Sequence, residues 1–254
     1  MRWDTKKNGA ACKSRKVYGV HSVQEYLRSV PHVVEEVYLL PSLKGSSLDQ
    51  LARQGGVAVR YESRDFFTTF SAGGGHQGVA ARLRPVPSPS LQDILKKGPE
   101  FLLVLDGILD PRNLGALLRT AEAAGVGGVI IPHRRAAPLS PVVEKTAAGA
   151  TAYVPLCRVA NLARSLESIR QAGYWVVGLA PEARQTLYEL RLPPKIALVL
   201  GGEEKGLRCL TRQKCDTLVA LPMRGQIKSL NVSVAGAVTL YELLRRKMDQ
   251  ERNH

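Results

Sequence analysis

Short, uninterrupted apolar runs alternate with amphipathic stretches throughout the second half of the chain. The runs are FLLVLDG (101–107), GGVIIP (127–132), YWVVGLA (174–180), IALVLGG (196–202) and DTLVALP (216–222). A strand that is apolar on both faces must be buried on both, which is typical of a parallel sheet covered by helices. Helical periodicity lies between the runs, at 113–125 and 161–173, and again at the end of the chain. The sequence therefore predicts a mostly parallel α/β domain over residues 100–254.

The segment before residue 84 predicts a second, smaller α/β unit, over residues 17–83. Helical and strand-like patterns alternate in it, at 18–30, 34–40, 48–56, 57–62 and 78–83. Three prolines and two serines in RPVPSPS then mark a linker, which we place at 84–99. Residues 1–16 hold six lysines and arginines against one aspartate, and we interpret them as a basic N-terminal arm.

The formal net charge of +14 favours a polyanionic partner, of which nucleic acid is the commonest. Solubility alone remains the alternative explanation. The first residues lack the apolar core of a secretory signal, and no apolar run has membrane-spanning length. The four cysteines form no Cys-x-x-Cys pair, which fits a reduced compartment. We therefore expect a cytoplasmic protein without a membrane partner.

The usual phosphate and metal motifs of α/β proteins are missing from the sequence. GVGGVI (125–130) is not G-x-G-x-x-G, and GGEEKGLR (201–208) lacks the Lys-Ser/Thr pair of a P-loop. The five histidines are scattered, and no cluster of potential ligands has metal-binding spacing. The sequence argues against a dinucleotide, ATP or metal site.

Polar loops follow three of the predicted strands, at the edge of the sheet where ligands of such folds bind. The loops are DPRNLGALLRTAEAAG (110–125), GGEEKGL (201–207) and LPMRGQIKSLNVSV (221–234). In the first loop Asn113 is a candidate helix N-cap, and Arg119 interrupts an apolar helical pattern. A solvated helix face would also explain Arg119. A helix cap would explain Ser229 or Asn231.

The stretches DPRNLGALLRTAEAAGV, LVLGGEEKGL and LPMRGQIKSLNVSVAGAVTLYE resemble the three motifs of the SpoU family of RNA ribose 2′-O-methyltransferases, which belong to the SPOUT class. VYGVHSVQEYL and HQGVAARL resemble the substrate domain of members that methylate guanosine in 23S ribosomal RNA. The resemblance implies a C-terminal, trefoil-knotted, mostly parallel α/β domain preceded by a small α/β RNA substrate-binding domain. It also implies a homodimer, in which the apolar face of Val234, Val238 and Tyr241 serves as core or interface.

The activity implied by the resemblance is transfer of a methyl group from S-adenosylmethionine to the ribose 2′-hydroxyl of a guanosine in 23S ribosomal RNA. The implied cofactor contacts, made by backbone groups, map to Gly201, Leu221 and Leu230. Two other interpretations stay open. One moves the substrate to transfer RNA or another ribosomal site, and the other is an RNA-binding assembly factor without catalysis.

The resemblance also implies the catalytic residues, which map to Arg119, Asn113, Glu203, Ser229 and Asn231. Arg119 is expected closest to the attacking 2′-hydroxyl, as a general base or as an electrostatic stabiliser. A guanidinium has a pKa above about 12, which favours the second role. Glu203 is expected to orient Arg119 or to accept a proton.

Overall fold

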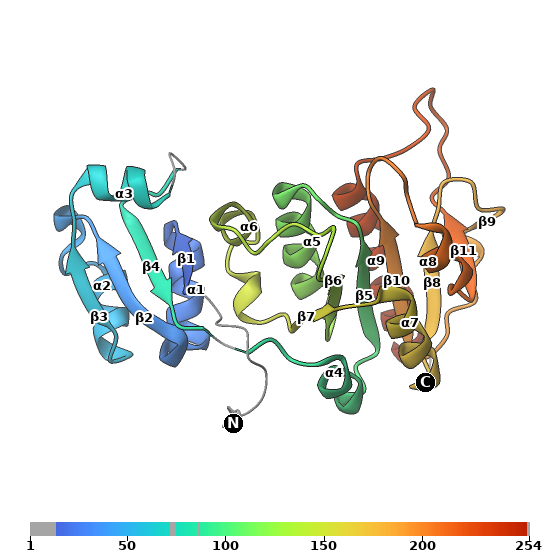
Figure 1. Ribbon diagram of the computed structural model, residues 1–254, viewed down its shortest axis with the longest axis horizontal. Coiled ribbons are helices and arrows are strands. Elements are labelled where there is room, and N and C mark those ends of the chain that lie inside the picture. The colour runs from blue at the N-terminus through green and yellow to red at the C-terminus, as the bar shows by residue number, and fades with distance from the viewer. Residues whose placement is uncertain (1–13, 72–74, 86, 253–254) are drawn as a thin grey trace. The chain divides into compact units, whose positions relative to one another are not determined.

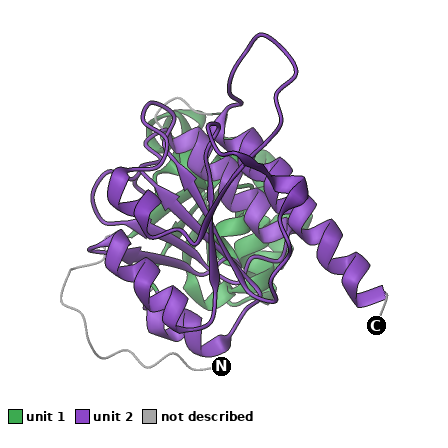
Figure 2. Cartoon of the chain, turned by 90° about the vertical axis from the view of Figure 1, so that its right-hand side faces the viewer, with its two compact units in different colours: residues 1–88, 139–152 green, residues 89–138, 153–254 purple. Residues whose placement is uncertain are grey.

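The computed structural model describes residues 14–71, 75–85 and 87–252 (Figure 1). The chain forms two compact units (Figure 2): unit 1 holds residues 1–88 and 139–152, and unit 2 holds 89–138 and 153–254. The chain thus leaves unit 2 after Pro138 and returns to it at Tyr153. Most of the expected basic arm lies outside the described residues.

Unit 1 is built on a four-stranded mixed sheet with the order β1-β4-β2-β3. Its elements are β1 (Arg15–Tyr18), α1 (Val20–Ser29), β2 (Val34–Leu39), α2 (Ser47–Gln54), β3 (Ala58–Tyr61), α3 (Arg64–Phe70), β4 (Val79–Leu83) and α6 (Pro141–Thr146), with short 3₁₀ turns at Pro31–Val33, Pro41–Leu43 and Ala150–Ala152. Residues of α1 and α2 form the main core with one face of the sheet. A smaller aromatic core lies between α3 and the other face.

A buried polar cluster holds the returning segment 139–152 within unit 1. The side chain of Glu144 in α6 is fully buried, and its Oε2 accepts hydrogen bonds from the hydroxyls of Tyr26 (3.3 Å) and Thr151. Among the residues that the structure describes, Glu144 Oε1 has no hydrogen-bond partner, but Arg15 Nη1 lies 3.4 Å from it as an ionic partner. Arg15 also donates to the Tyr26 hydroxyl at 2.8 Å. Burial and the adjacent Glu144 carboxylate raise the pKa of Tyr26, so the phenol remains a donor.

We expect Tyr26→Phe to lower the free energy of unfolding by about 1–3 kcal/mol, because a buried carboxylate loses a donor that water cannot replace. Urea unfolding followed by circular dichroism measures this. Tyr188→Phe is the matched control, since Tyr188 is 54% exposed and should tolerate the change. Equal stability of the two variants would contradict the structural role of the cluster.

Unit 2 is built on a seven-stranded sheet with the order β7-β6-β5-β10-β8-β11-β9, in which every pairing is parallel. Its elements are α4 (Leu91–Lys97), β5 (Phe101–Asp106), α5 (Pro111–Ala123), β6 (Val129–Pro132), β7 (Leu156–Val159), α7 (Leu162–Gln171), β8 (Trp175–Leu179), β9 (Gln185–Thr186), a 3₁₀ turn (Leu187–Glu189), β10 (Ile196–Gly201), α8 (Cys209–Gln213), β11 (Thr217–Ala220) and α9 (Val232–Arg252). The predicted mostly parallel α/β architecture is confirmed.

Helices cover both faces of this sheet (Figure 2). Residues of α4 and α7 pack on one face, where they meet the side chains of Ala197 and Val199 of β10. On the other face α9 packs against α5 and β10. A Cβ at Gly236 of α9 would lie 2.5 Å from Leu117 and 2.7 Å from Leu200, so glycine allows this close packing.

The structure refines several limits expected from the sequence. Within the stretch 84–99, expected to be linker, residues 91–97 form α4, whose Ile94 is buried in the core of unit 2. β1 begins at Arg15, inside the expected arm. Asn113 was a candidate N-cap of the helix at the first polar loop, but the structure shows Asp110 as the cap. Pro111 favours the first helical position, which places the cap at the residue before it. The threading of the last helix through a knot stays a prediction.

Candidate functional site

The order of the strands places a ligand site at the carboxyl ends of β5 and β10. The chain builds β5, β6 and β7 outward in one direction and then returns to place β8, β10 and β11 on the other side of β5. The switch falls between the paired strands β5 and β10, where Gly201 lies opposite Asp106. Ligands of open α/β sheets bind at such a switch point. Two of the three polar loops predicted from the sequence begin there.

The loop after β10 is fixed to the end of β5 by Asp106, which sequence reasoning missed. The Asp106 carboxylate is buried, pairs with the Arg208 guanidinium and accepts the Arg208 amide at 3.1 Å. The Asp106 carbonyl accepts the amide of Gly202 at 3.0 Å. A single aspartate at the end of an otherwise apolar run was the signal in the sequence, since a buried carboxylate needs partners. The Arg208 guanidinium neutralises this carboxylate, and the Arg208 amide ties the loop after β10 to the end of β5.

Main chain alone forms the tightest part of this loop. Gly206 donates its amide to the Gly202 carbonyl at 2.9 Å, which closes a small ring. A Cβ at Gly201 would lie 2.1 Å from the Gly206 carbonyl carbon, and one at Gly202 would lie 2.4 Å from the Gly107 carbonyl oxygen. No side chain fits at either position without moving backbone. The start of the loop after β10 is therefore a close backbone packing that only glycine permits.

Asn113 and Glu203 are the two predicted catalytic residues that the structure brings into contact. Asn113 Nδ2 donates to Glu203 Oε1 at 2.5 Å, across 90 residues of sequence. Asn113 lies in the first turn of α5 and is 8% exposed, whereas Glu203 is exposed. The amide thus holds one carboxylate oxygen and orients the exposed side chain. Among the described residues Glu203 forms no ion pair with Arg119, and its expected role, to orient Arg119 or to accept a proton, stays a prediction.

Arg119 lies on α5 and is exposed. None of the residues that the structure describes forms an ion pair with its guanidinium. Its neighbours Leu117 and Leu118 are buried, so the helix presents the guanidinium away from the core. An uncompensated cation on the helix that carries Asn113 is available to an anionic ligand.

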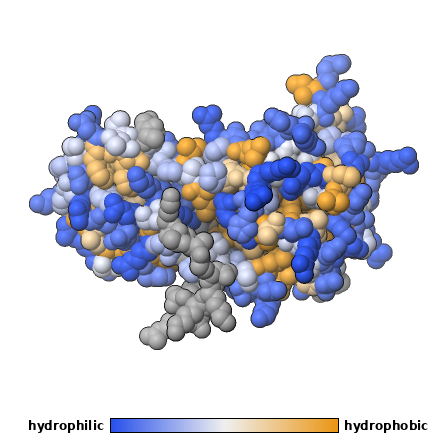
Figure 3. All heavy atoms as spheres, viewed as in Figure 1, coloured by the Kyte–Doolittle hydropathy of each residue, from blue (hydrophilic) through white to orange (hydrophobic). Residues whose placement is uncertain are grey.

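Residues 221–231 of the third polar loop project from the rest of unit 2 (Figure 2) and are largely exposed. Figure 3 shows hydrophobic and hydrophilic residues together at its end, where Ile227 is 75% exposed. Leu221 follows β11 directly and is half-buried, whereas Ser229 and Leu230 lie in the exposed part. Within the described part of the chain, no hydrogen bond joins Ser229 or Leu230 to Arg119 or Glu203.

Asn231 acts as the cap of α9. Its Oδ1 accepts the amide of Ser233 at 2.9 Å and the Ser233 hydroxyl at 2.6 Å. The helix-cap alternative considered for this residue is therefore seen in the structure, and its predicted place in catalysis stays a prediction. β8 separates β10 from β11, so the loops after β10 and β11 flank the end of β8.

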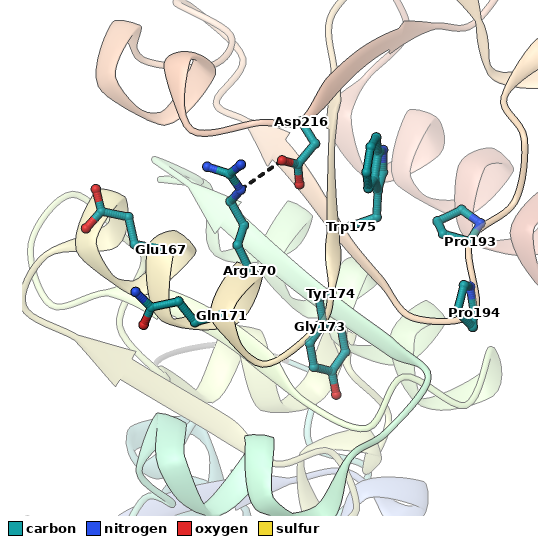
Figure 4. A pocket seen from close by; sticks show the side chains of 9 residues that line it. All are labelled: Glu167, Arg170, Gln171, Gly173, Tyr174, Trp175, Pro193, Pro194 and Asp216. Carbon is teal, nitrogen blue, oxygen red and sulfur yellow. Dashed lines mark ion pairs between the residues drawn. The ribbon is translucent and has the colours of Figure 1, made fainter.

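A hollow of about 600 Å³ lies at the opposite edge of the sheet, near the amino end of β8 (Figure 4). Trp175, Pro193 and Pro194 line it, together with an ion pair between Arg170 and Asp216 at 2.8 Å. Asp216 also accepts the amide of Val176, at 2.8 Å. Arg170 and Asp216 thus satisfy one another at the wall of the hollow.

Metal ligands and membrane spans are both lacking in the part of the chain that the structure describes. No group of three or more His, Cys, Asp or Glu side chains among these residues is placed to hold a metal ion. Over the same residues, none of the helices combines the length and apolar character needed to span a bilayer.

Comparison with known proteins identifies relatives of both units. Residues 100–241 match the SpoU rRNA Methylase family, and residues 16–89 match the family described as RNA 2′-O ribose methyltransferase substrate binding. A Salmonella typhimurium protein named 23S rRNA (guanosine-2′-O-)-methyltransferase RlmB is 42% identical over 241 residues, covering 92% of this chain and 99% of that protein. The Escherichia coli K12 protein of the same name is 41% identical with the same coverage.

Solved structures share the fold. The AdoMet-bound rRNA methyltransferase of Sinorhizobium meliloti superimposes with a TM-score of 0.78 at 24% identity, covering 92% of this chain and 87% of that one. The resemblance and the α/β fold inferred from the sequence are confirmed by these matches.

Proposed function

The chain belongs to the SpoU rRNA methylase family, and from that premise we propose that it methylates the ribose 2′-hydroxyl of a guanosine in 23S ribosomal RNA with S-adenosylmethionine. The observation that carries the proposal is the junction of the first two motifs: Asn113 on α5 holds Glu203 on the loop after β10, at the switch point of the sheet. The proposed substrate rests on the names of the relatives, which this chain matches over nearly their whole length.

The loop after β10 fits S-adenosylmethionine as its ligand. The cradle of Gly201 and Gly202 is formed by main chain, because a Cβ at either position would meet backbone. Such a surface suits the neutral polar edge of an adenine and the amino-acid end of the cofactor better than a row of phosphates, beside which the exposed carboxylates of Glu203 and Glu204 would be repulsive. Leu221 and Leu230 are proposed as further contacts, on the loop after β11.

The residues of the site then have distinct tasks. Bound S-adenosylmethionine supplies a methyl group already activated by the adjacent sulfonium. Arg119, which stays charged at all relevant pH values, anchors an RNA phosphate and stabilises negative charge as it develops on the ribose oxygen. Asn113 engages Glu203 Oε1, which leaves Oε2 to accept a hydrogen bond or proton from the 2′-hydroxyl. Ser229 and Asn231 are proposed to close the site from the third loop.

The proposal assigns RNA selection to the 17–83 domain and chemistry to the 100–254 domain. It includes the trefoil-knotted threading of the last helix, a site without metal, and a cytoplasmic location, where ribosomal RNA is found. The match of residues 16–89 to substrate-binding domains supports the division.

A methylation assay tests the substrate. Purified protein is incubated with S-adenosylmethionine labelled in the methyl group and with transcripts of 23S ribosomal RNA, 16S ribosomal RNA and transfer RNA. Label is expected in 23S RNA alone. Labelling of transfer RNA would show that transfer RNA is the substrate instead. If no methyl group is transferred to any of these RNAs, or to ribosomal particles at early stages of assembly, a factor without catalysis is favoured.

We propose a homodimer formed through α9. Val234, Val238, Tyr241 and Met248 lie on one side of this helix and are 40–51% exposed, so they do not belong to the core of the single chain. Apolar residues grouped in this way are typical of a protein interface. The face considered as core or interface in the sequence therefore remains available to a second copy.

We expect Val238→Glu to convert the dimer to a monomer, because each chain would place a carboxylate in an apolar interface. Light scattering coupled to size-exclusion chromatography measures the mass. Val142→Glu is the control, since Val142 of α6 is similarly exposed at 42% and lies off this face. A monomeric wild-type protein would contradict the proposal.

A further inference from the structure

Apolar and charged side chains alternate along β1 and β4, so the sheet of unit 1 has one apolar face and one face that carries charges. Val17, Val79 and Leu83 belong to the main core beneath α1 and α2. Lys16 of β1 precedes Val17, and Arg82 of β4 precedes Leu83, so both point to the other face of the sheet, where the register pairs them. A β-sheet residue and its successor lie on opposite faces, so these two cations lie on the same face.

Helix α3 covers only one end of this second face (Figure 1). Phe67 and Phe70 of α3 pack on Tyr18, Tyr38 and Ala80. Two residues further along each strand, Lys16, Arg82 and Glu36 are cross-strand neighbours on the same face. They lie beyond the residues packed under α3. Among the described residues, the apolar side chains that pack on this face are those under α3, and the cluster does not include Lys16, Arg82 or Glu36.

The charges of this row leave a net positive surface. The single carboxylate, Glu36, pairs with Arg60 and accepts the Tyr38 hydroxyl at 2.6 Å. Burial, and next the hydrogen bond to Glu36, raise the pKa of Tyr38 to about 12, so its hydroxyl remains a donor. Lys16 and Arg82 form no ion pair with any residue that the structure describes.

Aromatic rings lie directly under these cations. Lys16 Nζ is 4.9 Å from the centroid of the Phe70 ring, and the Arg82 guanidinium is 5.9 Å from that of Tyr38. Phe66 packs 4.8 Å from Tyr38 and is only partly buried. The surface therefore combines unpaired cations with an accessible ring edge.

We propose that this open face, defined as Lys16, Arg82 and Phe66 over the buried ring of Tyr38, binds an unpaired stretch of the RNA substrate. The inference rests on the proposed function and specifies the contact surface of its substrate-binding unit. Lys16 and Arg82 contact successive phosphates, and a base splayed from the strand packs on Phe66. Single-stranded RNA is the partner that this surface fits, because its backbone supplies the anions and its unstacked bases supply flat apolar faces.

Lys16→Gln/Arg82→Gln tests the proposal in the full chain, because glutamine keeps much of the aliphatic stem that covers the rings. Binding to a 23S ribosomal RNA transcript is measured by filter retention over a series of salt concentrations. The dissociation constant is expected to rise about tenfold or more at low salt. The slope of log affinity against log salt should decrease by about 1.4, because each phosphate of single-stranded RNA that a cation neutralises accounts for about 0.7 of the slope.

Arg28→Gln/Lys44→Gln is the matched control, because it removes the same charge from α1 and from the turn after Pro41–Leu43, off the open face. Its RNA affinity is expected to change less than threefold. Phe66→Leu keeps an apolar side chain but loses the ring, and should weaken binding about fivefold or more, with an unchanged salt slope. Thermal unfolding and S-adenosylmethionine affinity of each variant establish that it is folded.

Equal losses in the two double variants would overturn the inference, since overall charge would then explain the binding. So would an unchanged affinity of Lys16→Gln/Arg82→Gln, or complete competition by a double-stranded RNA of equal length. Failure of the proposed function is separate: it is seen as wild-type protein that transfers no methyl group, whichever variant binds RNA.

Discussion

Arg119→Ala is expected to lower the rate of methyl transfer to RNA about 10²- to 10³-fold, the usual cost of removing one preorganised charge partner of a transition state. The dissociation constant for S-adenosylmethionine should change less than a few-fold, because the proposed cofactor cradle is main chain of the loop after β10, and Arg119 is exposed on α5. Single-turnover kinetics and calorimetry measure the two quantities.

Arg164→Ala is the matched control, since it removes an exposed arginine from α7, on the other face of the same sheet. It is expected to turn over as the wild type does. If Arg119→Ala retained normal rates, the assignment of the site would be wrong. If it lost cofactor binding in proportion to its activity, Arg119 would be part of the cofactor site or of the fold.

Gly201→Ala is expected to weaken S-adenosylmethionine binding about 10- to 100-fold. The new Cβ would lie 2.1 Å from the Gly206 carbonyl carbon and 2.3 Å from the Leu207 amide nitrogen, so the loop after β10 must open. Overpacking against rigid neighbours costs about 1–3 kcal/mol, and here the distortion falls on the cradle itself. Calorimetric titration with the cofactor measures the loss.

Gly225→Ala is the control for this second variant, because nothing lies within 4 Å of a Cβ at that position and it belongs to the exposed loop after β11. Thermal unfolding of both variants separates a local change from loss of the fold. A Gly201→Ala protein that folds and binds the cofactor with wild-type affinity would show that the cradle lies elsewhere.

The sheet of unit 2 was predictable because its central strands are apolar on both faces. All five apolar runs of the sequence became strands β5, β6, β8, β10 and β11. β7 and β9 were missed, since they lie at the two edges of the sheet and include polar residues such as Arg158 and Gln185. Edge strands are less buried, so they lack the continuous apolar runs by which central parallel strands are recognised in a sequence.

Tertiary contacts decided what the local pattern left open. The stretch 91–97 sits beside a Pro/Ser-rich linker, yet Ile94 buries its side chain and Ser90 and Asp93 form a capping box. Glu144 looks like an ordinary helix-surface residue in the sequence, but it is fully buried against residues more than a hundred positions earlier. Such pairings depend on the folded chain and have no periodic signature.

The candidate site was readable in part. Asn113 and Glu203 meet as neighbours, which the placement of polar loops at strand ends made an expected outcome. Asp106 and Arg208 escaped notice because an aspartate after an apolar run is a common strand ending. The relation of Ser229 and Leu230 to the cofactor, and the knot, depend on how the long loop after β11 meets its ligand, and they stay predictions.

Identification of the methylated nucleoside tests the central claim most directly. 23S ribosomal RNA treated with the protein and S-adenosylmethionine is digested to nucleosides and analysed by liquid chromatography and mass spectrometry. The account predicts 2′-O-methylguanosine, in which the extra methyl mass stays with the ribose and the guanine fragment is unchanged. A methylated guanine fragment, or a methyl group on another nucleoside alone, would contradict it.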